Sequence, residues 1–190
     1  DLEISALKIL KKSINKNFDR AVNSIVDCQS KIILCGVGKS GLIASKIAST
    51  FSSVGSPAFS LSANDCFYGG LGSITKKDVL ILISNSGKSE EIVPIIKFAN
   101  RNKIKLIGIV SKKKSFLYKA SDIKILLPEV KESGLGVVPT SSTSIQLAIG
   151  DALAVAALKK KQFSKYDFSR LHPGGNLGRQ LKTVGDIMVL

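Results

Sequence analysis

Val79-Leu80-Ile81-Leu82-Ile83 runs directly into Ser84-Asn85-Ser86-Gly87-Lys88-Ser89-Glu90, and Ile92-Val93-x-Ile95-Ile96 follows. The short apolar run predicts a buried strand, and the spacing of the later apolar residues predicts a helix. The hydroxyl-rich segment between them is then a strand-to-helix turn. A helix begins with backbone N–H groups that lack partners and with the positive end of its dipole, so such a turn favours an anion. The alternative is an ordinary helix cap, because Ser and Asn are favoured there for their own sake.

Apolar runs at 32–35, 58–61, 106–110 and 123–127 predict four more strands, and helical spacing predicts helices at about 40–51, 90–102, near Phe116 and at 142–160. Residues 2–26 carry apolar residues at helical spacing and predict one long amphipathic helix, whereas the tail 163–190 is polar and Gly-rich. The alternation predicts an α/β fold: a three-layer αβα sandwich around a five-stranded parallel sheet, doubly wound and flavodoxin-like. Ligands of such sheets bind beyond the carboxyl ends of the strands, where Ser84 to Ser89 would lie.

Composition limits the class of protein. A chain of 190 residues with 44% hydrophobic content can bury the core of one domain of ordinary size. We expect a globular, cytoplasmic protein, since no apolar run approaches a bilayer span and the first residues lack the features of a signal peptide. Cys28, Cys35 and Cys66 are odd in number and have no paired metal spacing, so we expect reduced core thiols and neither disulfides nor zinc.

The net charge of +14 is compatible with nucleic-acid binding, but the distribution of the charge is not typical of it. Lysines are scattered along the chain, arginine occurs only at positions 20, 101, 170 and 179, and aromatic residues make up 6%. Stacking platforms and arginine-rich grooves are therefore missing. The sequence predicts a partner among small anionic metabolites, and neither nucleic acid nor membrane.

A second turn with the same character follows the first predicted strand, as Gly36-Val37-Gly38-Lys39-Ser40-Gly41. It fits the dinucleotide fingerprint G-x-G-x-x-G, but the second strand lacks the acidic residue which that fingerprint requires at its end. It does not fit a P-loop, because position 33 is Ile rather than Gly. What remains is an anion-binding turn with Lys39 at its centre.

Two further clusters carry polar chemistry. Pro139-Thr140-Ser141-Ser142-Thr143 opens the last long predicted helix, and Glu132 lies just upstream of it. Leu171-His172-Pro173-Gly174-Gly175-Asn176-Leu177-Gly178-Arg179 contains the only histidine of the chain. A lone histidine is commonly structural or simply exposed, but a Gly-Pro loop offers it no core.

Together with Gly150-Asp151-Ala152-Leu153-Ala154, these clusters make residues 31–188 resemble the sugar isomerase (SIS) domain of phosphosugar-binding proteins, and among them the arabinose-5-phosphate isomerases. The resemblance implies reversible conversion of D-ribulose 5-phosphate into D-arabinose 5-phosphate, which supplies the octulosonic acid (Kdo) of lipopolysaccharide. It implies no metal or organic cofactor. It also implies a homo-oligomer, expected to be a tetramer.

Carried over position by position, the resemblance places the catalytic groups on Lys39, Glu91, Glu132 and His172. An aldose–ketose isomerase needs a base that moves a proton between C1 and C2 through a cis-enediol. Glu132 is the first candidate for this base and Glu91 the second, and a partly desolvated site would raise either pKa toward neutrality. Lys39 would stabilise the enediolate or hold the phosphate, and His172 would shuttle protons and help to open the sugar ring. The expected substrate- and phosphate-binding residues are Gly38, Ser40, Ser84, Asn85, Ser86, Ser89, Thr140, Ser141, Ser142 and Thr143.

The chain departs from the family pattern at three places. Tyr68 and Gly70 stand where relatives usually carry His and Asp, Lys88 replaces a common Glu, and Ser62 replaces a His. A tyrosine can hydrogen-bond a hydroxyl but rarely titrates near neutral pH, so Tyr68 is a possible site residue with an altered role. Two alternatives therefore stay open: a sensor module that binds a sugar phosphate without turnover, and an isomerase of another sugar phosphate.

The expected domain organisation is one SIS domain over residues 1–183. Residues 184–190 contain Val184-Gly185-Asp186-Ile187-Met188, which resembles the start of a pair of cystathionine-synthase-type (CBS) modules. The SIS site would be completed between subunits, since the segment with His172 is long enough to reach a neighbour.

Overall fold

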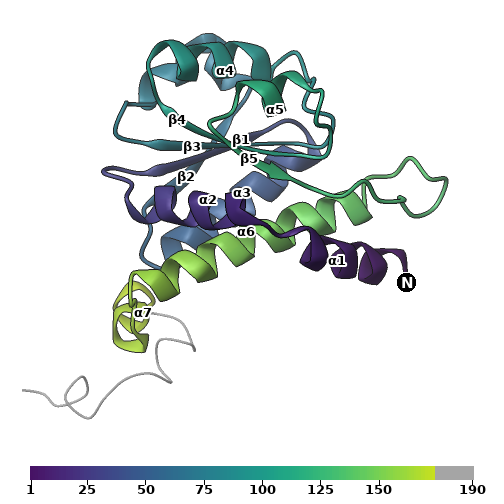
Figure 1. Cartoon of the computed structure of the whole chain (residues 1–190). Helices are drawn as coiled ribbons and strands as arrows, with labels where there is room; N and C mark the ends of the chain where they lie inside the picture. Colours follow the sequence, from purple (N-terminus) through teal and green to yellow (C-terminus); the bar gives the residue numbers. More distant parts are fainter. Residues whose placement is uncertain (174–190) are drawn as a thin grey trace, which may run out of the picture.

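A computed structural model describes residues 1–173 as a parallel five-stranded sheet between two layers of helices (Figure 1). The strands are β1 (Ile32–Gly36), β2 (Ala58–Ser62), β3 (Val79–Ser84), β4 (Lys105–Val110) and β5 (Ile123–Leu126), in the order β2-β1-β3-β4-β5. All four strand pairings are parallel. The predicted αβα sandwich of flavodoxin-like order is confirmed.

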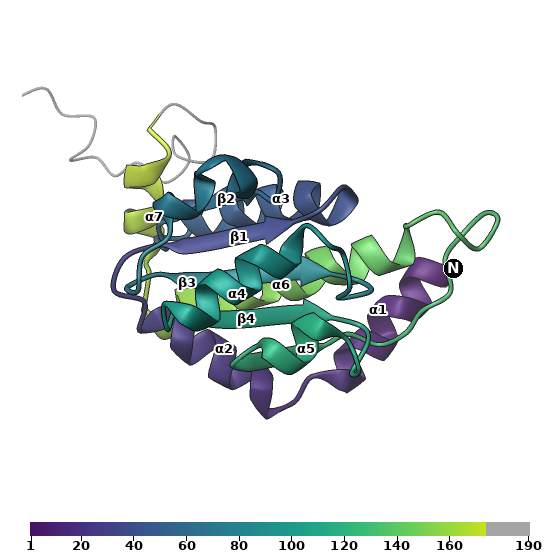
Figure 2. The same ribbon diagram turned by 90° about the horizontal axis from the view of Figure 1, so that it is seen from above.

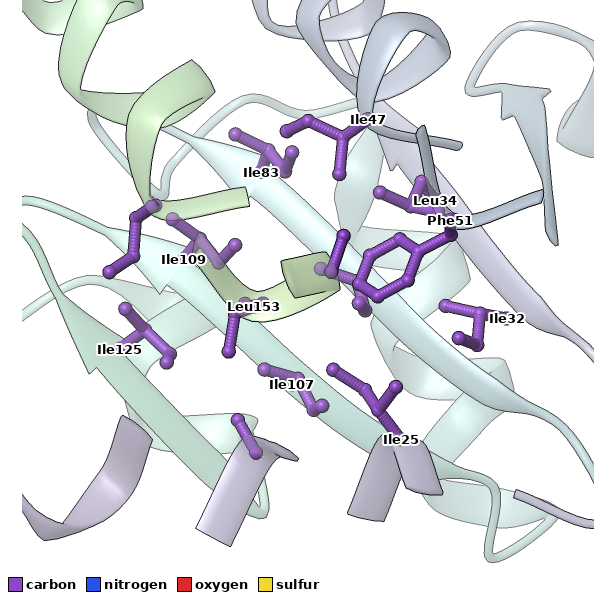
Figure 3. Close-up of a cluster of buried hydrophobic side chains, with 14 of the residues drawn as sticks. Ile25, Ile32, Leu34, Ile47, Phe51, Ile83, Ile107, Ile109, Ile125 and Leu153 are labelled. Carbon is purple, nitrogen blue, oxygen red and sulfur yellow. The ribbon is translucent and has the colours of Figure 1, made fainter. Parts of the chain in front are cut away.

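Each face of the sheet has its own apolar core, because successive side chains of a strand point to opposite faces. The cluster of Figure 3 includes Ile32 and Leu34 of β1 and packs under α2 (Lys16–Val26), α3 (Lys39–Ser53) and α6 (Ser141–Lys160). Ile33 and Cys35 point the other way and pack under α4 (Ile92–Arg101) and α5 (Phe116–Ala120). The strands are buried on both faces, which explains their continuous apolar runs.

The amino-terminal segment is two helices, so the prediction of one helix over 2–26 is wrong. α1 (Leu2–Ser13) ends where Ile14 adopts an extended conformation, with φ −63° and ψ 131°. The side chain of Asn15 then accepts a hydrogen bond from the backbone N–H of Asn17 and caps α2. A cap of this kind offers the backbone an alternative to continuing the helix. The apolar period runs across the break, which is why the sequence pattern did not reveal it.

The segment after α6 holds a helix that the sequence did not predict, α7 (Lys165–Leu171). A reciprocal capping box between Ser164 and Asp167 starts it. The two 3-10 helices η1 (Asp65–Tyr68) and η2 (Gly70–Ser73) lie between β2 and β3. The motif residues 174–179 and the predicted boundary at 183/184 lie outside the described part of the chain.

α6 bears on the expectation that no apolar stretch of the chain approaches the length of a bilayer span. The helix has 20 residues, and an 18-residue window within it has a mean hydropathy of 1.3, so it reaches the length and apolar content of a membrane span; half of that window is buried inside the fold. The helix is largely apolar because it packs under the sheet and is flanked by α3 on one side and by α1 and α2 on the other (Figure 2). It therefore has the character of a core helix.

Candidate active site

The turn after β1 brings a strand and a helix unusually close together. A Cβ atom added to Gly36 would lie 2.7 Å from the backbone carbonyl of Ser40, and one added to Gly41 would lie 2.8 Å from the carbonyl oxygen of Gly36. Gly38 caps α3 with φ 58° and ψ −127°, a conformation that favours glycine. The three glycines of the sequence motif thus allow a tight turn that starts α3 at Lys39.

This turn lies at the switch point of the sheet, where connections from β1 and β3 leave in opposite directions. A pocket of about 350 Å³ opens there, and it holds both Lys39 and Glu132. Its remaining lining comes from three segments: Val37 and Ser40, Asn85, and Gly136, Val137, Pro139, Ser142, Thr143 and Gln146. Five of the residues predicted from the sequence therefore share one pocket with the lysine.

Glu132 is fixed to the start of α6. Its Oε2 accepts hydrogen bonds from the backbone N–H of Thr140 at 2.9 Å, from the Thr140 hydroxyl at 3.2 Å and from the backbone N–H of Ser142 at 3.2 Å. The carboxylate thereby satisfies N–H groups that open the helix, and the positive end of the helix dipole favours its charge. None of these three hydrogen bonds goes to Oε1, which leaves this oxygen for a ligand.

The pKa of Glu132 lies below the ordinary glutamate value. Burial alone would raise this pKa, but the hydrogen bonds from Ser142 and Thr140 stabilise the charged form and outweigh it. The expectation that desolvation raises this pKa toward neutrality is wrong. Glu132 is a carboxylate at neutral pH.

In the turn after β3, Ser84, Asn85 and Ser86 use polar atoms to hold the loop itself. Ser84 Oγ accepts from the backbone N–H of Gly87 at 3.0 Å, and Ser86 Oγ accepts from that of Lys88 at 3.3 Å. Asn85 Oδ1 accepts from the hydroxyl of Ser111 at 2.7 Å, which ties the loop to the end of β4. Ser84 is buried, whereas Asn85 and Ser86 are exposed.

Ser86 belongs to a second, larger pocket of about 580 Å³ over the ends of β4 and β5. Lys88 and the lysines 112–114 surround it, above a floor that includes Leu126 and Leu127. This pocket contains none of the four predicted catalytic residues. The pocket with Lys39 and Glu132 is therefore the candidate active site.

Several predicted residues lie outside that pocket. Ser89 is half-buried in the turn before α4, and Glu91 is the N-cap residue of α4 and makes no capping bond with its side chain. Ser141 is fully buried, and its hydroxyl has no hydrogen-bond partner among the described residues. Tyr68 is 92% exposed at the end of η1.

His172 lies far from the pocket within the same chain. It follows α7, which lies at the end of α6 opposite the loop that carries Glu132 (Figure 1). A helix of 20 residues separates these ends by roughly 30 Å. The imidazole stacks on Phe168 with ring centroids 3.9 Å apart, and its Nδ1 lies 2.7 Å from the Phe168 carbonyl oxygen.

The profile of the family described as SIS domain matches residues 25–156. The chain belongs to the SIS domain family. Among curated proteins, it is 44% identical over 189 residues to "Arabinose 5-phosphate isomerase KdsD" of Yersinia pestis, covering 98% of this chain and 58% of the relative. A relative of the same name from Francisella tularensis is 46% identical over 184 residues, with coverage of 95% and 56%. The chain thus spans little more than half the length of these relatives.

The SIS fold of this chain also resembles solved structures. Escherichia coli CFT073 protein c3406, solved in complex with arabinose 5-phosphate, superposes with a TM-score of 0.86 at 35% identity, covering 90% of this chain and 92% of that one. The Vibrio vulnificus NanR protein, complexed with ManNAc-6P, has a TM-score of 0.79 at 19% identity and covers 90% of this chain and 65% of that one, which shows the fold alone.

Among the pocket residues that were not predicted from the sequence, Gln146 carries a polar side chain. Gln146 lines the pocket and is 1% exposed. It lies in the predicted last helix, on the face with the apolar residues Ile145 and Ile149, so a polar residue at a buried helical position was the available signal.

Proposed function

We propose that the chain carries the catalytic domain of an aldose–ketose isomerase that interconverts D-arabinose 5-phosphate and D-ribulose 5-phosphate. The observation that carries this proposal is the pocket at the switch point, which combines an ionised carboxylate, an ammonium group and several hydroxyls. The names of the relatives support the choice of sugar, as does the arabinose 5-phosphate complex of the E. coli protein.

Glu132 is the proposed base. Its Oε1 takes the proton from C2 of the open-chain aldose and returns it to C1, while a hydroxyl proton moves between the two oxygens, so that a cis-enediol is formed and consumed. The carbonyl moves from C1 to C2, and arabinose becomes ribulose. Lys39 stabilises the charge that develops on the enediolate oxygens. Glu91 is the less favoured candidate, because it does not line the pocket that holds Lys39.

We further propose that His172 acts in the active site of a neighbouring subunit, since its own pocket lies at the other end of α6. An exchange experiment tests this. Glu132→Gln and His172→Ala chains, each inactive alone, are mixed, dissociated and reassembled. Random assembly gives about a quarter of wild-type activity when Glu132 and His172 of one site come from different chains. A reassembled mixture that shows no activity would contradict a site shared between subunits.

Exposed apolar side chains support a homo-oligomer, for which we propose a tetramer. α1 buries Ala6 and Leu10 against the fold but exposes Leu2, Ile4, Leu7 and Ile9. A run of this kind on a protein surface marks an interaction site. We also propose a cytoplasmic enzyme that supplies Kdo synthesis, with residues 1–183 as its catalytic domain and 184–190 as the start of a link to CBS modules.

The direct test is a discontinuous assay in which ribulose 5-phosphate is supplied and arabinose 5-phosphate is quantified by chromatography. Turnover that is lost in Glu132→Gln and in His172→Ala supports both the reaction and the site. Wild-type protein that binds the sugar phosphate in a saturable manner without turning it over would contradict the enzyme and favour a sensor module. Turnover of a different sugar phosphate would retain the reaction type and change the substrate.

A further inference from the structure

Gln146 is a neutral amide buried beside the charged groups of the pocket. It lies in the second turn of α6, is 1% exposed, and shares the pocket lining with Lys39 and Glu132. Burying an amide without its hydrogen bonds costs about 1–3 kcal/mol, so buried amides are normally satisfied. Any hydrogen-bonding atom of Gln146 that the protein leaves unpaired is therefore a candidate to bind a ligand.

Only one end of this amide has a partner among residues 1–173. Gln146 Oε1 accepts a hydrogen bond from Ser40 Oγ at 3.1 Å, and no described residue accepts one from Nε2. A hydroxyl both donates and accepts, so either end of the amide can face Ser40, and the other end is left for the pocket. Ser40 follows Lys39 in the first turn of α3, which fixes the amide relative to the lysine.

We propose that Gln146 binds an oxygen of the sugar portion of the substrate and contributes to the choice of sugar. The inference rests on the proposed isomerase function. The amide shares its pocket with Glu132 and Lys39, so the part of the ligand that reaches these two groups also reaches Gln146. In the proposed reaction Glu132 and Lys39 act on C1 and C2 of the sugar, so the oxygen that the neighbouring amide meets is a hydroxyl or carbonyl oxygen of the sugar. A ligand without that oxygen would leave a buried amide unpaired, which is an effective means of discrimination.

The test compares two ligands on one variant. D-Arabinitol 5-phosphate carries the hydroxyls of the sugar but cannot be isomerised, and inorganic phosphate carries only the anion. Dissociation constants are measured by calorimetry for wild-type protein and for Gln146→Met, which keeps the length of the side chain. Gln29→Met, an exposed position in the turn after α2, is the matched control. Gln146→Leu is a second variant that also removes the amide without adding a charge.

We expect Gln146→Met to raise the Kd of arabinitol 5-phosphate about tenfold, which corresponds to about 1.4 kcal/mol, and to leave the Kd of inorganic phosphate unchanged. The control Gln29→Met should change neither dissociation constant. Gln146→Leu should show the same selective loss. An equal loss for both ligands, or no loss for either, would overturn the inference while the proposed function stands. Wild-type protein that does not bind arabinitol 5-phosphate would overturn the proposed function together with the inference.

Discussion

Replacing Gly150 by alanine should destabilise the protein, although alanine is the better helix former. Gly150 lies in α6 where this helix packs on α3, and an added Cβ would overlap Cδ1 of Ile47 and lie 2.6 Å from its Cγ1. Overpacking of this kind costs about 1–3 kcal/mol. The gain in helix propensity returns about 0.5–1 kcal/mol. The net loss is therefore about 0–2.5 kcal/mol, and a loss of about 1.3 kcal/mol, near the middle of that range, should lower Tm by roughly 3–5 °C for a domain of this size.

Thermal unfolding followed by circular dichroism measures this loss, and a double-mutant cycle assigns its cause. Ile47→Ala alone should cost about 2–5 kcal/mol by leaving a cavity. The double variant should be more stable than the sum of the two single effects by about 1–2 kcal/mol, because the new methyl group fills part of that cavity. A higher Tm for Gly150→Ala, or strict additivity in the cycle, would refute the close packing of α3 on α6.

Three further predictions concern pH, burial and assembly. Because the pKa of Glu132 is lowered, the acid limb of kcat/KM should lie below the ordinary glutamate value of about 4.3, and Thr140→Val, which removes one donor, should move it upward in initial-rate profiles. Asp78 is buried and paired with Lys31 at 3.1 Å, so Asp78→Asn should cost about 3 kcal/mol in urea unfolding at pH 7. Burial raises the pKa of Asp78, but hydrogen bonds from Thr75 and Lys31 outweigh it and lower this pKa overall. The stabilisation that Asp78 provides is therefore present above the ordinary aspartate pKa and is lost as the pH falls through the lowered pKa of the folded protein. The free energy of unfolding of Asp78→Asn should not show this loss at acid pH. Replacing Ile4 and Ile9 by lysine should reduce the assembled mass in sedimentation velocity without lowering helix content, and an unchanged mass would exclude this face of α1 from the interface.

The sequence predicted the sheet because its strands are buried on both faces and read as unbroken apolar runs. The same period argument failed at Ile14 and Asn15, where a local cap ends one helix and starts another without disturbing the apolar spacing. It also gave no sign of α7, whose start depends on a capping box rather than on a long apolar pattern.

The site was predictable in its residue types and less so in its arrangement. The sequence identified Lys39 and Glu132, and the sheet order places them in one pocket. It could not show that Glu132 caps α6, because that contact depends on how the loop from 132 to 140 folds back. The direction of the pKa shift follows from those hydrogen bonds, and so the expectation from burial alone had the wrong sign.

The hydrogen bonds by which Glu132 caps α6 also affect the roles of Glu132 and Lys39 in the proposed reaction. In the proposed reaction the Glu132 carboxylate takes a proton from carbon, which weakens its hydrogen bonds to the start of the helix, so the protonated acid would be a short-lived, high-energy species. Such an acid gives the proton back quickly, which favours delivery to the neighbouring carbon over exchange with solvent. A weak base, in turn, makes the first proton abstraction harder. The enediolate intermediate must then be stabilised by other groups of the pocket, and in the proposed reaction these are the Lys39 ammonium and the polar groups around it.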